Sequence, residues 1–527
     1  MDQPDAHNFR LERTVLAHSH RFLLVEVVLL GASRRWRKAH FAQAANIWRW
    51  DALVNSLGLP ETSNRFELPS EGRIEKWERH KGDYSAHTER VNSFVLHEIE
   101  AARTPLLRTL ETQDMELTLT ARERTTQGRD ESRAFTTLFN EVSPETPSIG
   151  IKDMVQVAGH SLTLGTRAYE SQKCKEDAPV ISSLKDAGIG IAGMLNQHAL
   201  AYGATGISSQ MGSAVNALDP DAMPGGSSSG SGVAVANRFV DYALGTDTGG
   251  SVRIPASLNG VVGFKPTFGR LPMDGVAPLA PSLDHLGLMA RNVKDTAAVF
   301  TAIDPSSHSC HGLRVAPGEE ITLGLPRAYF LEELDQETRT SFEQLLRIMG
   351  RQENIRFVDI ELSGAEIVAS TQLAIMAREA LETNLQLLRT RGDLLPEDVR
   401  LRLELGRWIS DHTYQQAKSI QEFWKQSVEA AFGSCHAILL PAVPIKAPRL
   451  NDTTAQLTTI EVTVQNALTR LTAPFNLSGH PAVTLPFREP NRRIPLGIQL
   501  VGPFSCDLEL LAIASAIEGF VATTGAE

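Results

Sequence analysis

Short apolar segments typical of strands, separated by longer segments typical of helices, constrain the fold of this chain most strongly. After Pro144, the segment PSIGIKDMVQV shows the β-branched alternation of a strand. Residues 340–432 are helical in character, and three apolar segments follow within residues 436–502, namely HAILLPAVP, PAVTLPF and PLGIQLVG. Strands separated by helices indicate a layered α/β fold.

The composition favours a globular protein and argues against several classes of partner. Hydrophobic residues make up 42% of the 527 residues and charged residues 21%, close to the averages of globular proteins. The net charge of -11 argues against general affinity for nucleic acid or an anionic membrane. The most apolar segment, residues 22–32, is too short to span a bilayer and contains Glu26, so we expect no transmembrane segment.

The four cysteines lie far apart in the sequence. They form no CxxC pair and have no histidine nearby at metal-ligand spacing. We therefore expect reduced thiols, no metal site and a cytoplasmic location. These cysteines are Cys174, Cys310, Cys435 and Cys506.

The N-terminal part of the chain has a different character. Residues 1–85 are rich in Arg, Trp and His, and contain no motif with a defined chemistry. We interpret them as a helical N-terminal extension of unknown role. From residue 86 to about 110, apolar residues recur at roughly helical spacing, which predicts a surface helix.

The segment PGGSSSGSG at residues 224–232 has three interpretations: a flexible loop, a phosphate-binding loop or a nucleophile elbow. A P-loop would need Lys-Ser or Lys-Thr after its last glycine, but Val233 and Ala234 follow. Gly226 to Gly230 matches the GxSxG pattern of an elbow. An elbow must follow a buried strand, however, and the preceding NALDPDAM is polar and turn-forming.

Two further positions have both a chemical and a structural interpretation. Ser251 follows two glycines in GTDTGGSVRIP, where the backbone could form an oxyanion hole or the serine could cap a short helix. Lys152 is either a solvated lysine at a strand end or, if it points inward, a desolvated amine held in its neutral form. A neutral amine can act as the base for a serine nucleophile. His198 and His285 lie in no motif with a serine and a carboxylate, and we expect packing or surface roles for them.

These motifs occur together, and together they resemble one family. GIKD, GGSSSGSGVAVA and GTDTGGSVRIPASLNGVVGFKPTFGR strongly resemble the amidase signature family, in which a lysine and two serines form the catalytic triad. The family includes fatty acid amide hydrolase, indoleacetamide hydrolase and the amidotransferase A subunit. Further matches, such as GVAPLAPSLDHLGLMARNVKDTA and APFNLSGHPAVTLP, extend the similarity over roughly residues 145–515.

The resemblance implies a role for each matched residue. Ser251 would be the nucleophile, Ser227 the proton relay and Lys152 the general base. It further implies a cis Gly226–Ser227 peptide bond, and it requires no metal and no cofactor. The backbone N–H groups of Thr248, Gly249, Gly250 and Ser251 would hold the oxyanion, while Asp247, Arg253 and Ser228 would support the site, the first two as an ion pair.

The resemblance also implies the architecture. We expect a single large α/β/α domain with a mixed central sheet covered by helices. We place this domain at residues 86–524, with a catalytic core at about 145–303, a helical insert at about 340–432 and C-terminal strands at 437–502.

The implied function is hydrolysis of a carboxamide bond in a small, linear amide, through an acyl-enzyme. The main alternative is an amidotransferase A subunit, which passes ammonia to aminoacyl-tRNA and works only with partner subunits. The N-terminal extension and the absence of that subunit's usual NMDEFAMG segment argue against it, since this chain reads LNQHALAYG at residues 195–203. A non-catalytic binding protein with the same fold is a third hypothesis. For the oligomeric state, a homodimer is one hypothesis. Short aliphatic, aryl and fatty acyl amides all remain open as substrates.

Overall fold

The computed structural model describes residues 129–139, 143, 145–169, 172–304, 319–490 and 492–523. The predicted N-terminal extension and the predicted helix at residues 86–110 lie outside these ranges, and so does Cys310.

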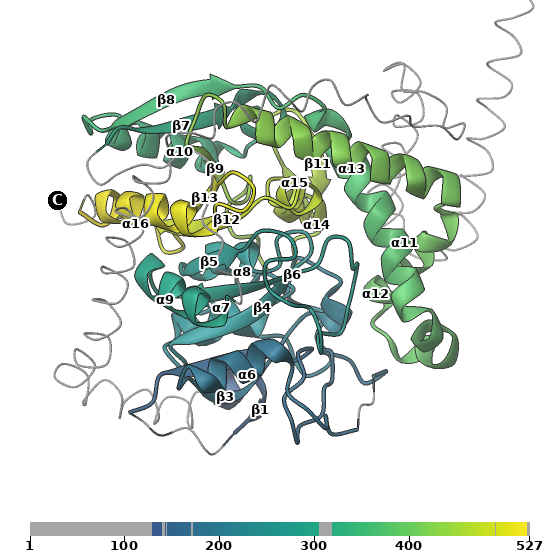
Figure 1. The fold of residues 1–527 in the computed structure, drawn as a ribbon. Helices are drawn as coiled ribbons and strands as arrows, with labels where there is room; N and C mark the ends of the chain where they lie inside the picture. Colours follow the sequence, from purple (N-terminus) through teal and green to yellow (C-terminus); the bar gives the residue numbers. More distant parts are fainter. Residues whose placement is uncertain are drawn as a thin grey trace, which may run out of the picture.

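An eleven-stranded mixed sheet runs through the described part of the chain, from β1 at the bottom of Figure 1 to β8 at the top. Adjacent strands are parallel within the group β3–β2–β4 and within the group β9–β7–β8. All other adjacent pairs are antiparallel. In spatial order the strands are β1 (Phe135–Leu138), β3 (Gly190–Leu195), β2 (Ser148–Lys152), β4 (Tyr242–Asp247), β6 (His285–Ala290), β5 (Val262–Lys265), β12 (Ala482–Phe487), β13 (Leu496–Val501), β9 (Ala437–Pro441), β7 (Ile321–Pro326) and β8 (Ile355–Ile360).

Helices cover both faces of the central strands. Successive side chains of a strand point to opposite faces, so neighbouring residues of β4 identify the two layers. Leu244 packs in the cluster that includes α6 (Pro179–Asp186), α9 (Val293–Ile303) and α16 (Asp507–Thr523). Ala243 packs in a separate cluster with α7 (Ser229–Ala236) and α8 (Arg253–Asn259). Because the central strands are covered on both faces, their sequences are mainly apolar, with polar residues such as Thr246 and Asp247 at the strand ends.

The remaining helices belong mainly to the segment between β7 and β9. In Figure 1, α11, α12 and α13 are drawn in green to one side of the sheet, and α11 contacts both other helices and α15. The helices between β7 and β9 are α10 (Gln336–Met349), α11 (Ala365–Arg391), α12 (Glu397–Leu405) and α13 (Asp411–Ala431). After β9 come the hairpin β10 (Thr454–Gln456) and β11 (Glu461–Thr463), then α14 (Val464–Thr469) and α15 (Ala473–Leu477). The short helix α5 (Arg129–Ser132) precedes β1.

The sequence of α13 explains why it folds as an amphipathic helix. Its buried residues Ala417, Ile420, Trp424 and Val428 recur three or four positions apart, which places them on one face. Ser410 caps the helix, since its side chain accepts a hydrogen bond from the backbone N–H of Thr413. The indole Nε1 of Trp424 donates to the Pro474 carbonyl at 2.7 Å, so α13 is tied to the start of α15.

The α/β class, the mixed sheet and its helical covering are confirmed. The strand predicted after Pro144 is β2, and the three apolar segments near the C-terminus are β9, β12 and β13. The prediction that residues 340–432 are helical is wrong at β8, which lies between α10 and α11 and forms the edge of the sheet. The side chains of this edge strand are mostly half-buried or exposed, so it lacks the continuous apolar pattern of the central strands.

The expectation of reduced thiols holds for Cys174 and Cys435, which are free, but it is wrong for Cys506, which is disulfide-bonded. Sequence spacing did not indicate that bond. None of the described helices is both long enough and apolar enough to cross a membrane.

A fully buried ion pair connects the sheet to α8 and to the C-terminal segment. Arg253 Nη2 donates to Asp247 Oδ1 at 2.8 Å, and Arg253 Nε donates to Asp247 Oδ2 at 3.1 Å. The other N–H groups of the guanidinium donate to the Thr472 carbonyl, Gln499 Oε1 and Asn476 Oδ1. All five N–H donors of Arg253 are therefore satisfied.

Electrostatics at this pair favours the charged state of the Asp247 carboxylate. Burial raises the pKa of the Asp247 carboxyl, but the Arg253 charge and hydrogen bonds lower it more, so the pKa lies well below its usual range. Neither side chain is exposed to solvent.

We predict that Arg253→Met destabilises the protein by about 3–5 kcal/mol, because it leaves the buried Asp247 carboxylate without its partner. Urea unfolding, followed by circular dichroism, measures the loss. Arg327→Met is the matched control, since it breaks an exposed pair with Asp359 and should cost no more than about 1 kcal/mol. Equal, small effects of the two substitutions would contradict the prediction.

Candidate active site

Two parallel strands bring the predicted base to one edge of the sheet. β2 and β4 are parallel neighbours, with Ile151 opposite Leu244, so their carboxyl ends meet. Lys152 is the last residue of β2 and is fully buried. Its Nζ lies 2.6 Å from Ser227 Oγ and 2.8 Å from Thr246 Oγ1, which belongs to β4. The amine is thus within hydrogen-bond distance of two hydroxyl groups.

The surroundings of Lys152 favour an uncharged amine. Within the part of the chain that the structure describes, no carboxylate forms an ion pair with Lys152. Burial lowers the pKa of the Lys152 amine from 10.5 to about 7, while the charges of Asp247 and Asp284 act in the opposite direction. A large fraction of the amine is therefore unprotonated near neutral pH, as a general base requires.

The Gly/Ser segment is a buried turn before α7. Ser227 is fully buried, and the Gly226–Ser227 peptide bond is cis, as the resemblance implied. A Cβ at Gly226 would lie 2.8 Å from the Gly203 carbonyl oxygen, so the close approach of these backbones requires glycine. Ser228 Oγ donates to the Thr246 carbonyl at 3.2 Å, which joins the turn to β4.

Asp247 shapes the turn that carries Ser251. Its Oδ1 accepts the Gly250 N–H at 2.8 Å, and its Oδ2 accepts the Val252 N–H at 3.1 Å. Gly250 has a φ of +123°, and a Cβ there would clash with Thr472 Oγ1, so this position also requires glycine. The carboxylate of the ion pair therefore determines the backbone path on both sides of Ser251.

The two serine turns are neighbours. The Ser228 N–H donates to the Ser251 carbonyl at 3.2 Å, and Ser251 is 8% exposed, whereas Ser227 is fully buried. Among the described residues, no hydrogen bond links Ser227 Oγ directly to Ser251 Oγ. Ser251 does not cap α8, because the residue before that helix is Val252 and no side chain caps it.

The predicted oxyanion donors differ in their availability. The N–H groups of Thr248, Gly249 and Ser251 donate no hydrogen bond within the described structure. The N–H of Gly250, in contrast, donates to Asp247. In the described structure the N–H groups of Thr248, Gly249 and Ser251 are therefore the available ones, and the role of Gly250 as an oxyanion donor stays a prediction.

Several residues that sequence reasoning missed hold this turn from distant segments. Asp284 Oδ1 accepts the Thr248 hydroxyl at 2.7 Å, and burial raises the pKa of Asp284 to about 6. Gln372 Nε2, from α11, donates to the Thr248 carbonyl at 2.9 Å. Thr472 Oγ1 donates to the Gly249 carbonyl at 2.7 Å. Asp284 and Thr472 lie in or beside segments that match the family, but Gln372 lies in the helical insert, where no motif marked it.

The two histidines lie in the packed interior of the protein, in line with the expected packing role. His198 is buried with its Nε2 3.3 Å from Asp398 Oδ2, and His285 is buried with its Nδ1 2.7 Å from the Leu283 carbonyl. Burial lowers the pKa of both imidazoles. Neither ring forms a hydrogen bond with Ser227 or Ser251 among the described residues.

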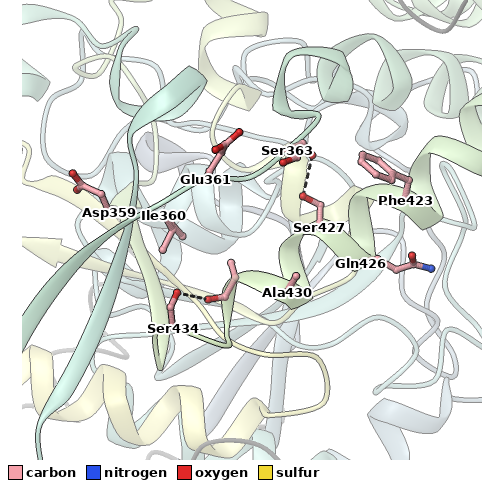
Figure 2. A pocket seen from close by; sticks show the side chains of 10 residues that line it. Asp359, Ile360, Glu361, Ser363, Phe423, Gln426, Ser427, Ala430 and Ser434 are labelled. Carbon is pink, nitrogen blue, oxygen red and sulfur yellow. Dashed lines mark hydrogen bonds between the residues drawn. The ribbon is translucent and has the colours of Figure 1, made fainter. Parts of the chain in front are cut away.

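Other features in the described structure offer no alternative centre. No group of three or more His, Cys, Asp or Glu side chains in the described ranges is arranged to hold a metal ion. A surface hollow of about 540 Å³ lies between β8 and α13, as Figure 2 shows. Asp359, Glu361 and Phe423 line it, and none of the predicted site residues does.

Comparison with known proteins identifies relatives of this chain. The amidase family model matches residues 148–511. The A subunit of the Myxococcus xanthus glutamyl-tRNA(Gln) amidotransferase is 33% identical over 408 residues, which are 70% of this chain and 82% of the relative. A crystal structure of an amidase has a TM-score of 0.71 at 30% identity, covering 80% of this chain and 99% of that one.

A second solved structure, the A subunit of the Thermotoga maritima glutamyl-tRNA(Gln) amidotransferase, has a TM-score of 0.65 at 27% identity. It covers 77% of this chain and 92% of that chain. The family model alone covers more than half of the chain, and the chain belongs to the amidase signature family.

Proposed function

We propose that this protein is an amidase that hydrolyses the C–N bond of a linear carboxamide through an acyl-enzyme on Ser251. The observation that carries the proposal is the buried Lys152 amine, 2.6 Å from Ser227 Oγ and with a pKa of about 7. A buried amine that is partly neutral at pH 7 and touches a serine hydroxyl has the properties of a general base.

In the proposed acylation, Ser251 Oγ attacks the amide carbon and passes its proton to Ser227 Oγ. Ser227 passes its own proton to the Lys152 amine, which becomes an ammonium. The oxygen of the tetrahedral intermediate carries the negative charge and accepts hydrogen bonds from the N–H groups of Thr248, Gly249 and Ser251. Each such preorganised donor contributes about 3–4 kcal/mol to the stability of the transition state.

The intermediate then collapses and the C–N bond breaks. The leaving nitrogen receives the proton of the Lys152 ammonium through Ser227 and departs as ammonia or an amine. Water attacks the Ser251 ester in the second half of the reaction, with the same relay as its base. The carboxylic acid is released and Ser251 recovers its proton.

We predict that Ser251→Ala lowers kcat by a factor of about 10⁴ or more, because it removes the nucleophile. Lys152→Met should lower it by about 10²–10⁴, because it removes the base while filling a similar volume. Steady-state hydrolysis of short aliphatic, aryl and fatty acyl amides measures these losses and identifies the preferred acyl group.

The matched control for these variants is Ser228→Ala. Its hydroxyl bonds to the backbone of Thr246 and does not contact Lys152, so a much smaller loss is expected. Labelling by a fluorophosphonate should also disappear in Ser251→Ala and persist in Ser228→Ala. Equal losses in Lys152→Met and Ser228→Ala would remove the proposed role of the lysine.

The pH dependence follows from the lowered pKa of Lys152. The base is active when unprotonated, so kcat/KM should rise about tenfold per pH unit below pH 7 and level off above it. Measurements of kcat/KM between pH 5.5 and 8.5 test this. A profile that falls as the pH rises through 7 would contradict the assignment of Lys152 as base.

The similarity to the A subunits of amidotransferases supports a second candidate, in which the chain supplies ammonia to a partner enzyme. We predict that the purified chain hydrolyses simple amides without any partner, because the residues of the proposed relay all come from one chain. The assay contains neither tRNA nor any partner protein. Activity that appears only after a cognate partner is added would favour the amidotransferase instead.

A further inference from the structure

The Lys152 amine contacts two hydroxyl groups, and its single lone pair can accept a proton from only one of them. A neutral amine has two N–H donors and a single acceptor site. Nζ lies 2.6 Å from Ser227 Oγ and 2.8 Å from Thr246 Oγ1. If the lone pair faced Thr246, the amine could not accept the proton of Ser227. The direction of the lone pair therefore decides whether the amine can act as the base.

The hydroxyl of Thr246 has a second partner that settles this direction. Thr246 Oγ1 lies 3.3 Å from the thioether sulfur of Met154. A thioether has lone pairs but no proton, so in this contact Thr246 must be the donor. The single proton of the hydroxyl is then committed to sulfur. Thr246 Oγ1 can face Lys152 only as an acceptor.

We propose that Met154 and Thr246 are positioning residues that orient the lone pair of Lys152 toward Ser227, and so set the direction of the proton relay. This inference rests on the proposed function. In the resting state, one N–H of the amine donates to Thr246 Oγ1 and the lone pair accepts from the Ser227 hydroxyl. After proton transfer, the ammonium donates to both hydroxyl oxygens, so Thr246 also stabilises the charged state.

Burial of Lys152, Thr246 and Met154 keeps water from competing for their hydrogen bonds. Lys152, Thr246 and Met154 are 0%, 2% and 3% exposed, respectively. The hydroxyl and the amine are thus enclosed by protein, where a weak hydrogen bond to sulfur competes with few alternatives.

The ionisable groups that interact electrostatically with Lys152 form no hydrogen bond with its amine in the described structure. Asp247 follows Thr246 on β4, Asp284 precedes β6, and His198 follows β3. Asp247 is bonded to Arg253, and Asp284 to Thr248. In the described structure, the hydrogen bonds of the amine are those to Ser227 and Thr246.

The fold allows this role to be tested with little disturbance. The backbone of Thr246 is held by its pairing with Leu286 on β6 and by Ser228 Oγ, which bonds to the Thr246 carbonyl. Thr246→Val removes the hydroxyl at nearly constant volume. Met154→Leu removes the sulfur acceptor and preserves the apolar volume.

The experiment compares the wild type, Thr246→Val, Met154→Leu and the double variant. It measures kcat/KM against pH, and the pKa of Lys152 by NMR of lysine labelled at Cε. Thr246→Val should lower kcat/KM about 10–100-fold and the pKa of Lys152 by about one unit, because the ammonium loses an acceptor. Met154→Leu should lower kcat/KM about 3–10-fold, since the freed hydroxyl can donate to the lone pair. Thr246→Ser should restore the pKa and most of the rate.

The double variant gives the decisive comparison. If Met154 acts through the Thr246 hydroxyl, adding Met154→Leu to Thr246→Val should have no further effect on rate or pKa. Independent, multiplying losses would overturn the inference, and so would an unchanged Lys152 pKa in Thr246→Val. If the wild type hydrolysed no amide and fluorophosphonate did not label Ser251, the proposed function would fail, while the pKa values of the four proteins would still decide the orientation of the amine.

Discussion

The buried ion pair between Asp247 and Arg253 is the interaction on which the geometry of the site depends. Arg253 uses all its N–H groups on Asp247 and on three residues from the C-terminal part of the chain. The Asp247 carboxylate in turn receives the Gly250 and Val252 N–H groups, which flank Ser251. A buried carboxylate is tolerated when its charge is matched and its lone pairs are bonded, and the turn provides those bonds. The shape of the turn that carries Ser251 is thus a consequence of solvating one buried charge.

Three buried cationic side chains in this fold show that burial alone does not create a base. Arg253 is paired with the Asp247 carboxylate, and its guanidinium offers only N–H donors. Burial lowers the pKa of the Lys265 amine well below its ordinary value, but Lys265 donates to the carbonyls of Pro266 and His480, and among the described residues it forms no hydrogen bond with a hydroxyl group. Lys152 is also desolvated, yet its partners are hydroxyl groups. Proton transfer needs both a neutral amine and an adjacent group that can give up a proton, and of these three side chains Lys152 alone combines them.

Sequence patterns predicted the parts of the structure whose causes are local. The β2 and C-terminal strands follow from apolar segments, and the α13 helix follows from the spacing of its apolar residues. The roles of Lys152, Ser227 and Ser251 came from a family resemblance, and they remain proposals that the geometry supports. What could not be predicted depends on contacts between distant segments. Gln372 bonds to Thr248, more than a hundred residues away in the sequence. The strand β8 is recognisable chiefly by its pairing with β7. The Gly250 N–H is already bonded to the carboxylate of Asp247.

The two chemical tasks of the proposed site are supported by different parts of the chain. The base side is built from β2, β4 and the Gly/Ser turn, which are neighbours in the sheet and form one hydrogen-bonded unit around Lys152. The oxyanion side is held by Asp284, by Thr472 and by Gln372 of α11, so the helical insert touches the turn directly. Met376, one helical turn after Gln372, lies 3.6 Å from the position of a Cβ at Gly249. Side chains of α11 therefore lie beside the turn at Thr248 and Gly249, whereas the hydrogen bonds of the Lys152 amine go to Ser227 and Thr246, so the two parts of the proposed site rest on different side chains.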